Sequence, residues 1–268
     1  WKPGGRVLVA SGPAADAATT LGDPFDPAGA PAEIVACGVP EGLLAELERE
    51  ADKQGMSLSV AASLDALGDA RFDDLVLLGA DAALYERLEP LAATGATLNL
   101  VGASGLTEAA QVDIGRLHYD RLALMGTPGH EIGAGYAPIR TEFLPGGRMA
   151  LLGAAGPMGQ MHFQRALQAA VPPRLIVATS RVMDRLALLP AKFAELIASR
   201  SDETQVLAMA SAGRDPATFN QQLLDAALGT GGEGYDDVIV LAPSTQVVMD
   251  AMAMIASTLV LLAQSPSE

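Results

Sequence analysis

The feature that most constrains this chain is an internal repeat, because short blocks of its first half recur in the same order in its second half. The matched pairs are Lys2–Val9 with Leu144–Leu151, Ile34–Cys37 with Ile176–Thr179, Phe72–Leu78 with Tyr235–Leu241, and Thr97–Leu98 with Thr258–Leu259. Ordered matches of this kind indicate a duplicated unit of roughly 120–145 residues, which limits the fold to two copies of one architecture.

Each copy alternates short apolar segments with helix-length segments. Strands are predicted at 7–10, 34–37, 58–60, 75–78 and 97–101, then at 149–152, 175–179, 205–209, 238–241 and 258–262; helices in the second copy are predicted at 160–169, 183–199 and 219–228. Continuous Val, Ile and Leu runs between helices are typical of parallel strands covered on both faces. We therefore predict an α/β fold with two tandem doubly wound parallel sheets, each Rossmann-like. Met249, Met252 and Met254 fall on a further predicted helix and should pack into the core.

The composition suggests where one copy ends and the next begins. We predict a degenerate Rossmann-like unit at 1–128, a linker at 129–145 and a dinucleotide-binding unit at 146–268. The stretch Thr127–Pro145 is rich in Gly and Pro, which is typical of a connection. Because this connection is short, we expect the two units to pack together.

A glycine-rich turn in the second copy predicts a nucleotide site. Gly153–Gly159 (GAAGPMG) follows a predicted strand and precedes a predicted helix, which is the context of the dinucleotide fingerprint Gly-x-Gly-x-x-Gly. In the strict pattern Ala154 occupies the first glycine position, and Gly156 and Gly159 occupy the other two. Such glycines let the backbone approach a pyrophosphate, and the helix N-terminus supplies amide donors. The alternative is a helix start that merely needs small residues.

The end of the next predicted strand bears on the cofactor. It is followed by Ser180 and Arg181, and Arg185 lies one helical turn further on. An acidic residue here would bind the ribose hydroxyl of NAD, whereas arginine can pair with the 2′-phosphate of NADP. The pattern favours NADP over NAD; the alternative is that both arginines are ordinary solvated residues.

The first copy has lost most of this chemistry. Its turn, Ala10–Ala15, keeps a single glycine, and Asp16 follows with a carboxylate that would oppose a bound phosphate. The charge distribution points the same way, because the first copy is the more acidic: residues 1–128 carry 8 basic and 19 acidic side chains, whereas residues 129–268 carry 9 and 13. We therefore expect the first copy to be a structural unit.

These motifs resemble the coenzyme-binding domain of the zinc-type medium-chain alcohol dehydrogenases, and within that family the L-sorbose 1-phosphate reductases. The resemblance rests on Pro145–Arg148 with Leu151–Gly159, on Tyr235–Val240 with Ala242 and Pro243, and on Thr97–Gly102, Leu117–Tyr119 and Met125–Gly129 in the first copy. The resemblance implies that Ala242 and Pro243 follow a strand lining the adenosine side of the pocket. It also suggests that the two copies pair edge to edge, as coenzyme domains of that family do.

The motifs and the resemblance together give the expected cofactor site. Its residues are Gly153, Ala154, Gly156, Pro157, Met158, Gly159, Ser180, Arg181, Arg185, Ala242 and Pro243. The family's zinc-binding catalytic domain has no counterpart in this sequence, whose single cysteine, Cys37, lies in an apolar strand-like run. We expect no zinc in this chain and identify no catalytic residue; the catalytic chemistry should come from a segment outside it.

Composition excludes some classes of partner. Half of the 268 residues are apolar and 18% are charged, which is typical of a globular protein with a sizeable core. No apolar run approaches the ~20 residues that span a bilayer, and a net charge of −15 disfavours nucleic acids and anionic membranes. We expect a cytoplasmic protein that binds a dinucleotide and, given the resemblance, forms a homo-oligomer or pairs with a separate catalytic domain.

Three interpretations of function remain open. The first is the coenzyme-binding portion of an NAD(P)-dependent oxidoreductase, with NADP favoured, acting on an alcohol, polyol or sugar phosphate. The second is a non-catalytic nucleotide-binding or scaffolding module made of two Rossmann-like units. The third is a purely structural fragment in which the first copy provides packing.

Overall fold

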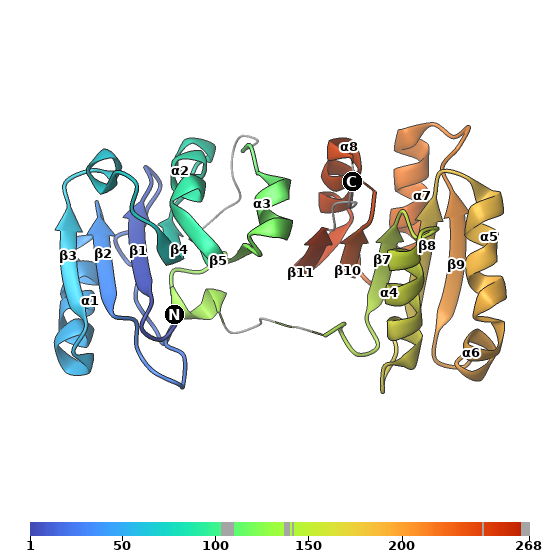
Figure 1. Cartoon of the computed structure of the whole chain (residues 1–268), viewed down its shortest axis with the longest axis horizontal. Coiled ribbons are helices and arrows are strands. Elements are labelled where there is room, and N and C mark those ends of the chain that lie inside the picture. Colours follow the sequence, from blue (N-terminus) through green and yellow to red (C-terminus); the bar gives the residue numbers. More distant parts are fainter. Residues whose placement is uncertain (103–109, 137–139, 141, 243, 264–268) are drawn as a thin grey trace. The chain divides into compact units, whose positions relative to one another are not determined.

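The computed structural model describes residues 1–102, 110–136, 140, 142–242 and 244–263, the last eight of these by their backbone alone. The chain forms two compact units, Trp1–Ile139 (unit 1) and Arg140–Glu268 (unit 2), and each contains one parallel sheet with helices against it (Figure 1). The predicted α/β fold with two parallel, Rossmann-like sheets is confirmed. The division between the units falls inside the segment 129–145.

Unit 1 has six parallel strands in the order β3-β2-β1-β4-β5-β6. They are β1 (Arg6–Ser11), β2 (Glu33–Cys37), β3 (Ser57–Ala61), β4 (Phe72–Leu78), β5 (Ala92–Val101) and β6 (Ala123–Thr127). The helices are α1 (Glu41–Gln54), α2 (Ala82–Leu88) and α3 (Ile114–Tyr119). Successive residues of β1 face opposite sides of the sheet, so Val9 packs in the cluster that contains α1 and Leu8 in the cluster that contains α2.

Unit 2 has five parallel strands in the order β11-β10-β7-β8-β9. They are β7 (Arg148–Leu152), β8 (Leu175–Ser180), β9 (Gln205–Ala210), β10 (Tyr235–Val240) and β11 (Ile255–Ala263). The helices are α4 (Pro157–Gln168), α5 (Met183–Lys192), α6 (Ala194–Ser199), α7 (Pro216–Leu228) and α8 (Thr245–Met252). Helices α4 and α5 cover one face, and α7 and α8 cover the other. In the described part of the chain, no helix is both long enough and apolar enough to cross a bilayer.

The two sheets share one topology. Numbered along each unit, the first five strands lie in the order 3-2-1-4-5, which is the order of dinucleotide-binding sheets. The register also shifts at the same place, between Phe72 and Asp74 in unit 1 and between Tyr235 and Asp237 in unit 2. Asp74 pairs with Thr97, and Asp237 pairs with Val260. The match of Thr97 to Thr258 is therefore wrong by two residues, because the pairing of the strands sets the equivalence.

Two aspartates at the start of β4 hold the turn before β1. Asp73 Oδ2 accepts the amide of Arg6 at 3.0 Å, and Asp74 Oδ2 accepts the amide of Lys2 at 2.9 Å. Asp74 is 3% exposed, and burial raises the pKa of its carboxyl group, with the Lys2 amide opposing that effect. The central strands β1 and β4 are thus tied together by side chains as well as by their ladder.

Unit 2 repeats this arrangement at its own aspartate pair. Asp236 Oδ2 accepts the amide of Arg148 at 2.8 Å, and Asp237 Oδ2 accepts the amide of Leu144 at 2.8 Å. Asp237 also forms a 3.0 Å ion pair with Arg140. Burial raises the pKa of Asp237, although the Leu144 amide and the Arg140 guanidinium both favour its charged form. The same two bonds therefore begin the first strand of both units.

Two predictions about helices are wrong. The predicted helix 183–199 is divided at Phe193 into α5 and α6; Pro190 lies in the last turn of α5, where it removes a backbone donor, and the Phe193 ring packs against Phe163. Of the three methionines expected in the core, Met254 is buried, but Met249 and Met252 are 56% and 52% exposed. These two lie on the outer side of α8. Their spacing correctly indicated a helix, but it could not indicate whether that helix face is buried.

Replacing Asp237 with Ala should lower the free energy of unfolding of unit 2 by about 2–3 kcal/mol, because the Arg140 charge and the Leu144 amide lose their partner. Hydrogen exchange measured by mass spectrometry should quicken in peptides from β7 and β10 and stay unchanged in unit 1. The matched control is Asp225→Ala on α7, whose carboxylate bonds only to Gln221 among described residues. Equal effects of the two substitutions would contradict this account.

Candidate functional site

The turn after β7 bends at Gly153. This residue has a φ of +95°, and a Cβ atom placed on it would lie 3.1 Å from the amide nitrogen of Ala242. The amides of Gly153 and Ala154 both donate to the carbonyl oxygen of Thr179, at 3.2 and 2.7 Å. The glycine that permits the tight turn is thus Gly153, and Ala154 follows it with its side chain fully buried.

The other two glycines have different surroundings. A Cβ atom on Gly159 would lie 2.1 Å from the carbonyl oxygen of Ala154, so this glycine lets α4 pack directly on the turn. A Cβ atom on Gly156 would meet nothing within 4 Å, so the backbone there faces open space. Gly156 is the N-cap of α4, Pro157 begins the helix, and no side chain caps its first turn. An uncapped helix N-terminus beside an open glycine is suited to an anionic group.

The turn lies where the strand order reverses. Strand β7 has β8 on one side and β10 on the other, so the chain leaves the sheet in different directions from β7 and β10. Leu241, directly after β10, donates its amide to Leu152 at the end of β7 at 2.8 Å, which brings Ala242 beside Gly153. Doubly wound sheets bind their ligands at this switch point. Pro243, the other residue expected here, lies outside the described residues.

The end of β8 presents two free cations at the same edge. Ser180 ends the strand, its carbonyl accepts the amide of Ser211 at 2.9 Å, and the carbonyl of Arg181 accepts that of Ala212 at 2.9 Å. Arg181 and Arg185 are exposed. Of the nine Lys and Arg residues of unit 2, these are the two whose side chains form no hydrogen bond or ion pair with any residue that the structure describes.

Unit 1 closes the equivalent position. A Cβ atom on Gly12 would lie 2.5 Å from the carbonyl oxygen of Gly79, and one on Gly79 would lie 2.2 Å from the carbonyl carbon of Ala14. The turn after β1 is therefore packed against the chain that leaves β4. Residues 12–32, all described, contain no helix, so unit 1 has no helix N-terminus at its first turn.

A second segment of unit 1 takes the place of that helix. The amide of Thr20 donates to the carbonyl of His130 at 2.9 Å, and the amide of Ile132 donates to the carbonyl of Thr20 at 3.0 Å. Ile132 is fully buried in one cluster with Leu21 and the core side of α1. His130 Nδ1 also lies 3.5 Å from Asp16 Oδ2. The first turn of unit 1 is thus covered by the protein itself.

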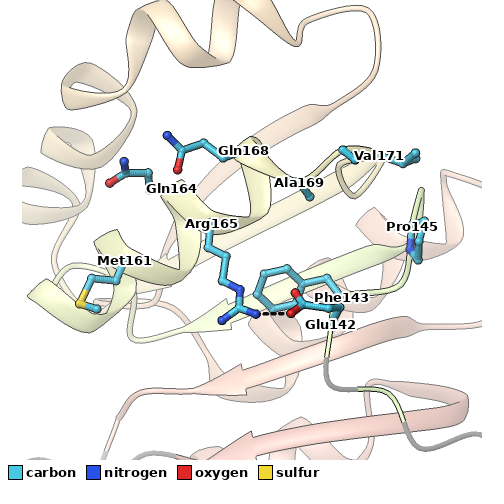
Figure 2. A pocket seen from close by; sticks show the side chains of 10 residues that line it. Glu142, Phe143, Pro145, Met161, Gln164, Arg165, Gln168, Ala169 and Val171 are labelled. Atoms are coloured by element: carbon cyan, nitrogen blue, oxygen red, sulfur yellow. Dashed lines mark hydrogen bonds and ion pairs between the residues drawn. The ribbon is translucent and has the colours of Figure 1, made fainter.

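A hollow of about 600 Å³ lies elsewhere on unit 2, along the outer side of α4. Figure 2 shows the 2.6 Å ion pair of Arg165 and Glu142 crossing it near the Phe143 ring, with Met161 at one end and Val171 at the other. None of the expected cofactor residues lines this hollow. Because the hollow contains none of these residues, we base the candidate site on the geometry at the switch point and not on the size of the hollow.

Two further observations concern metal and thiol chemistry. In the described ranges, no three His, Cys, Asp or Glu side chains come together as a group that could hold a metal ion. Cys37 is buried at the end of β2, and burial raises the pKa of its thiol, opposed in part by Arg87. This burial agrees with the position of Cys37 in an apolar strand-like run of the sequence.

Fold and topology define the chain as a Rossmann-like α/β protein, and one curated relative resembles part of it. The chain is 35% identical over 114 residues to a mannitol-1-phosphate 5-dehydrogenase from Aliivibrio fischeri, and the match covers 41% of this chain and 25% of that protein. The matched region thus spans about a quarter of the relative's length. No family model and no solved structure matches the chain. The similarity is to a polyol-phosphate dehydrogenase, and it leaves the alcohol dehydrogenase branch suggested by the motifs as a proposal.

Substitutions of Gly159 and Gly156 should distinguish a glycine that is packed against the turn from one that faces open space. Gly159→Ala should lower the free energy of unfolding of unit 2 by about 1–3 kcal/mol, because the new methyl group collides with the Ala154 carbonyl. Gly156→Ala should cost less than about 1 kcal/mol, the difference between Gly and Ala at an N-cap. Urea unfolding of the full chain followed by circular dichroism, with exchange rates of α4 peptides, measures both. A larger loss for Gly156→Ala would contradict the open geometry.

Proposed function

We propose that unit 2 binds a nicotinamide dinucleotide at the switch point between β7 and β10. The observation that carries this proposal is the open backbone at Gly156 in front of the uncapped N-terminus of α4, at the end of the central strand. The pyrophosphate would lie against Gly153–Gly159, with Met158, 42% exposed, beside it. Ala242 and Pro243 would line the adenosine side. The bound nicotinamide supplies hydride exchange; the residues of this chain bind and orient it.

We further propose NADP as the preferred cofactor. Arg181 and Arg185 have no partner among the described residues, whereas an acidic residue that would select the ribose hydroxyl of NAD is missing from the strand end Ser180–Arg181. A guanidinium group pairs with a 2′-phosphate through two parallel hydrogen bonds, which makes Arg181 the main determinant and Arg185 its support. Ser180 supplies a neutral hydroxyl at the same strand end.

The whole protein, in this proposal, is an oxidoreductase of an alcohol, polyol or sugar phosphate. The supporting observations are the partial similarity to a polyol-phosphate dehydrogenase and the resemblance of the glycine turn to the medium-chain alcohol dehydrogenases. The catalytic residues would lie in a part outside this sequence. The duplication also belongs to the proposal, supported by the shared strand order and register shift, and edge-to-edge pairing of the two units stays a prediction.

Arg181→Ala should weaken NADPH binding by about 10- to 100-fold and NADH binding by less than about 3-fold, because only NADPH carries the 2′-phosphate that loses its partner. Arg185→Ala should act in the same direction with a smaller effect. Fluorescence titration of the full chain with each nucleotide measures both. The matched control is Arg174→Ala, which removes an exposed arginine directly before β8, at the opposite end of the strand. Equal losses for the two nucleotides would refute the assignment to the 2′-phosphate.

Gly156→Ala should weaken NADPH and NADH equally, by at least about 10-fold, since both share the pyrophosphate that approaches this backbone. Its small effect on stability separates loss of binding from loss of fold. Absence of any nucleotide binding by the wild-type chain, or unchanged affinity in Gly156→Ala, would leave the proposed site without support.

A further inference from the structure

The turn that follows the first strand is held to a different neighbouring strand in each unit. Strands β1 and β2 pair in the same register as β7 and β8, so Cys37 of unit 1 corresponds to Thr179 of unit 2. By the same register Gly12 corresponds to Ala154. The amide of Gly12 donates to the carbonyl of Leu78 on β4 at 2.8 Å. The amide of Ala154 donates instead to the carbonyl of Thr179 on β8, at 2.7 Å.

The side chain of Thr179 takes part in holding the turn of unit 2. Its hydroxyl oxygen accepts the amide of Gly153 at 3.3 Å, and the same amide also donates to the Thr179 carbonyl at 3.2 Å. The residue is 6% exposed, and a β-branched side chain has few χ1 rotamers, so the hydroxyl is confined to this place. Because the hydroxyl shares the Gly153 amide, the carbonyl is available for the shorter bond from Ala154.

Unit 1 has a thiol at this position. Cys37 is buried, as Thr179 is, but sulfur is a weaker hydrogen-bond acceptor than a hydroxyl oxygen. A thiol there cannot share the amide of the turn as Thr179 does. The turn of unit 1 is bonded to β4 and packs against Gly79. The difference in side chain thus coincides with the difference in the direction of the turn.

The direction of the turn in turn sets the position of α4. A Cβ atom on Gly159 would lie 2.1 Å from the carbonyl oxygen of Ala154, so the first turn of α4 rests directly on Ala154. Gly156, the N-cap of that helix, lies between these two residues. Moving Ala154 away from β8 would therefore move the open backbone at Gly156 with it.

We propose that Thr179 is a positioning residue for the dinucleotide. Its hydroxyl holds the Gly153–Gly159 turn toward β8 and so places the backbone of Gly156 where the pyrophosphate approaches. The inference rests on the proposed binding of a dinucleotide by unit 2, and it assigns no contact between Thr179 and the nucleotide. NADPH and NADH share the pyrophosphate, so Thr179 should act equally on both, in contrast to Arg181.

Isothermal titration calorimetry of the full chain with NADPH and with NADH tests the role of the hydroxyl. Thr179→Val keeps the shape of the side chain and removes the acceptor, and it should weaken both nucleotides by the same factor, about 3- to 10-fold. Thr179→Cys, which introduces the residue of unit 1, should have a similar effect. Thr179→Ser retains the hydroxyl and should bind both nucleotides within about 2-fold of the wild type.

The matched control is Thr204→Val. Thr204 is also 6% exposed, but it lies directly before β9, at the opposite end of the strands, and its hydroxyl has no hydrogen-bond partner among the described residues. This substitution should leave both affinities unchanged. Thermal unfolding followed by circular dichroism verifies that each variant is folded.

The possible failures can be told apart. A wild-type chain that binds neither nucleotide overturns the proposed function and this inference with it. Binding by the wild type together with unchanged affinities in Thr179→Val and Thr179→Cys overturns the inference about Thr179 alone. A loss in Thr179→Ser as large as that in Thr179→Val also overturns it, because the hydroxyl would then not be the group that matters.

Discussion

The fold of each unit depends on a pair of aspartates at the start of its fourth strand. Asp73 and Asp74 in unit 1, and Asp236 and Asp237 in unit 2, accept the amides of the turn that begins the first strand. These bonds cross the boundary between strands one and four, where the strand order reverses. They therefore help to fix the register of strands one and four, whose far ends lie one sheet length away from the aspartates, at the edge where the candidate site of unit 2 lies.

The two units share one strand order but differ at the carboxyl ends of their central strands. In unit 1 the chain leaves β4 through Gly79, which has no side chain, and the turn at Gly12 packs onto it. In unit 2 the corresponding residue is Ala242, and the glycine lies on the opposite strand end, at Gly153. Ala242 lies directly beside Gly153, and α4 follows this turn with no side chain capping its N-terminus. In unit 1 no helix follows β1 within residues 12–32 and Gly12 packs against Gly79, whereas in unit 2 α4 follows β7 and the backbone at Gly156 faces open space.

The sequence predicted the strands and helices that depend on local apolar runs, since the periodicity of buried residues is a local property. It missed features set by distant contacts. The sequence matched Thr97 with Thr258, whereas the pairing of β10 with β11 makes Val260 the equivalent residue, two positions further on. Residues His130 and Ile132, expected in a linker, hydrogen-bond to Thr20. The role of Thr179 was also missed, because a threonine at a strand end carries no signal in the fingerprint until its carbonyl is seen to hold the turn.

The charge distribution explains how an acidic chain could present a site for an anionic cofactor. The net charge of −15 repels the phosphates of a dinucleotide at long range. Screening confines such interactions to about 8–10 Å at physiological ionic strength, so the local arrangement decides. Seven of the nine cations of unit 2 are engaged with protein partners, four of them in ion pairs with carboxylates. The positive charge without a protein partner is thereby left at Arg181 and Arg185, beside the open turn. In the proposed NADP site, selectivity for a phosphorylated ribose would rest on these two arginines and would need no basic surface elsewhere.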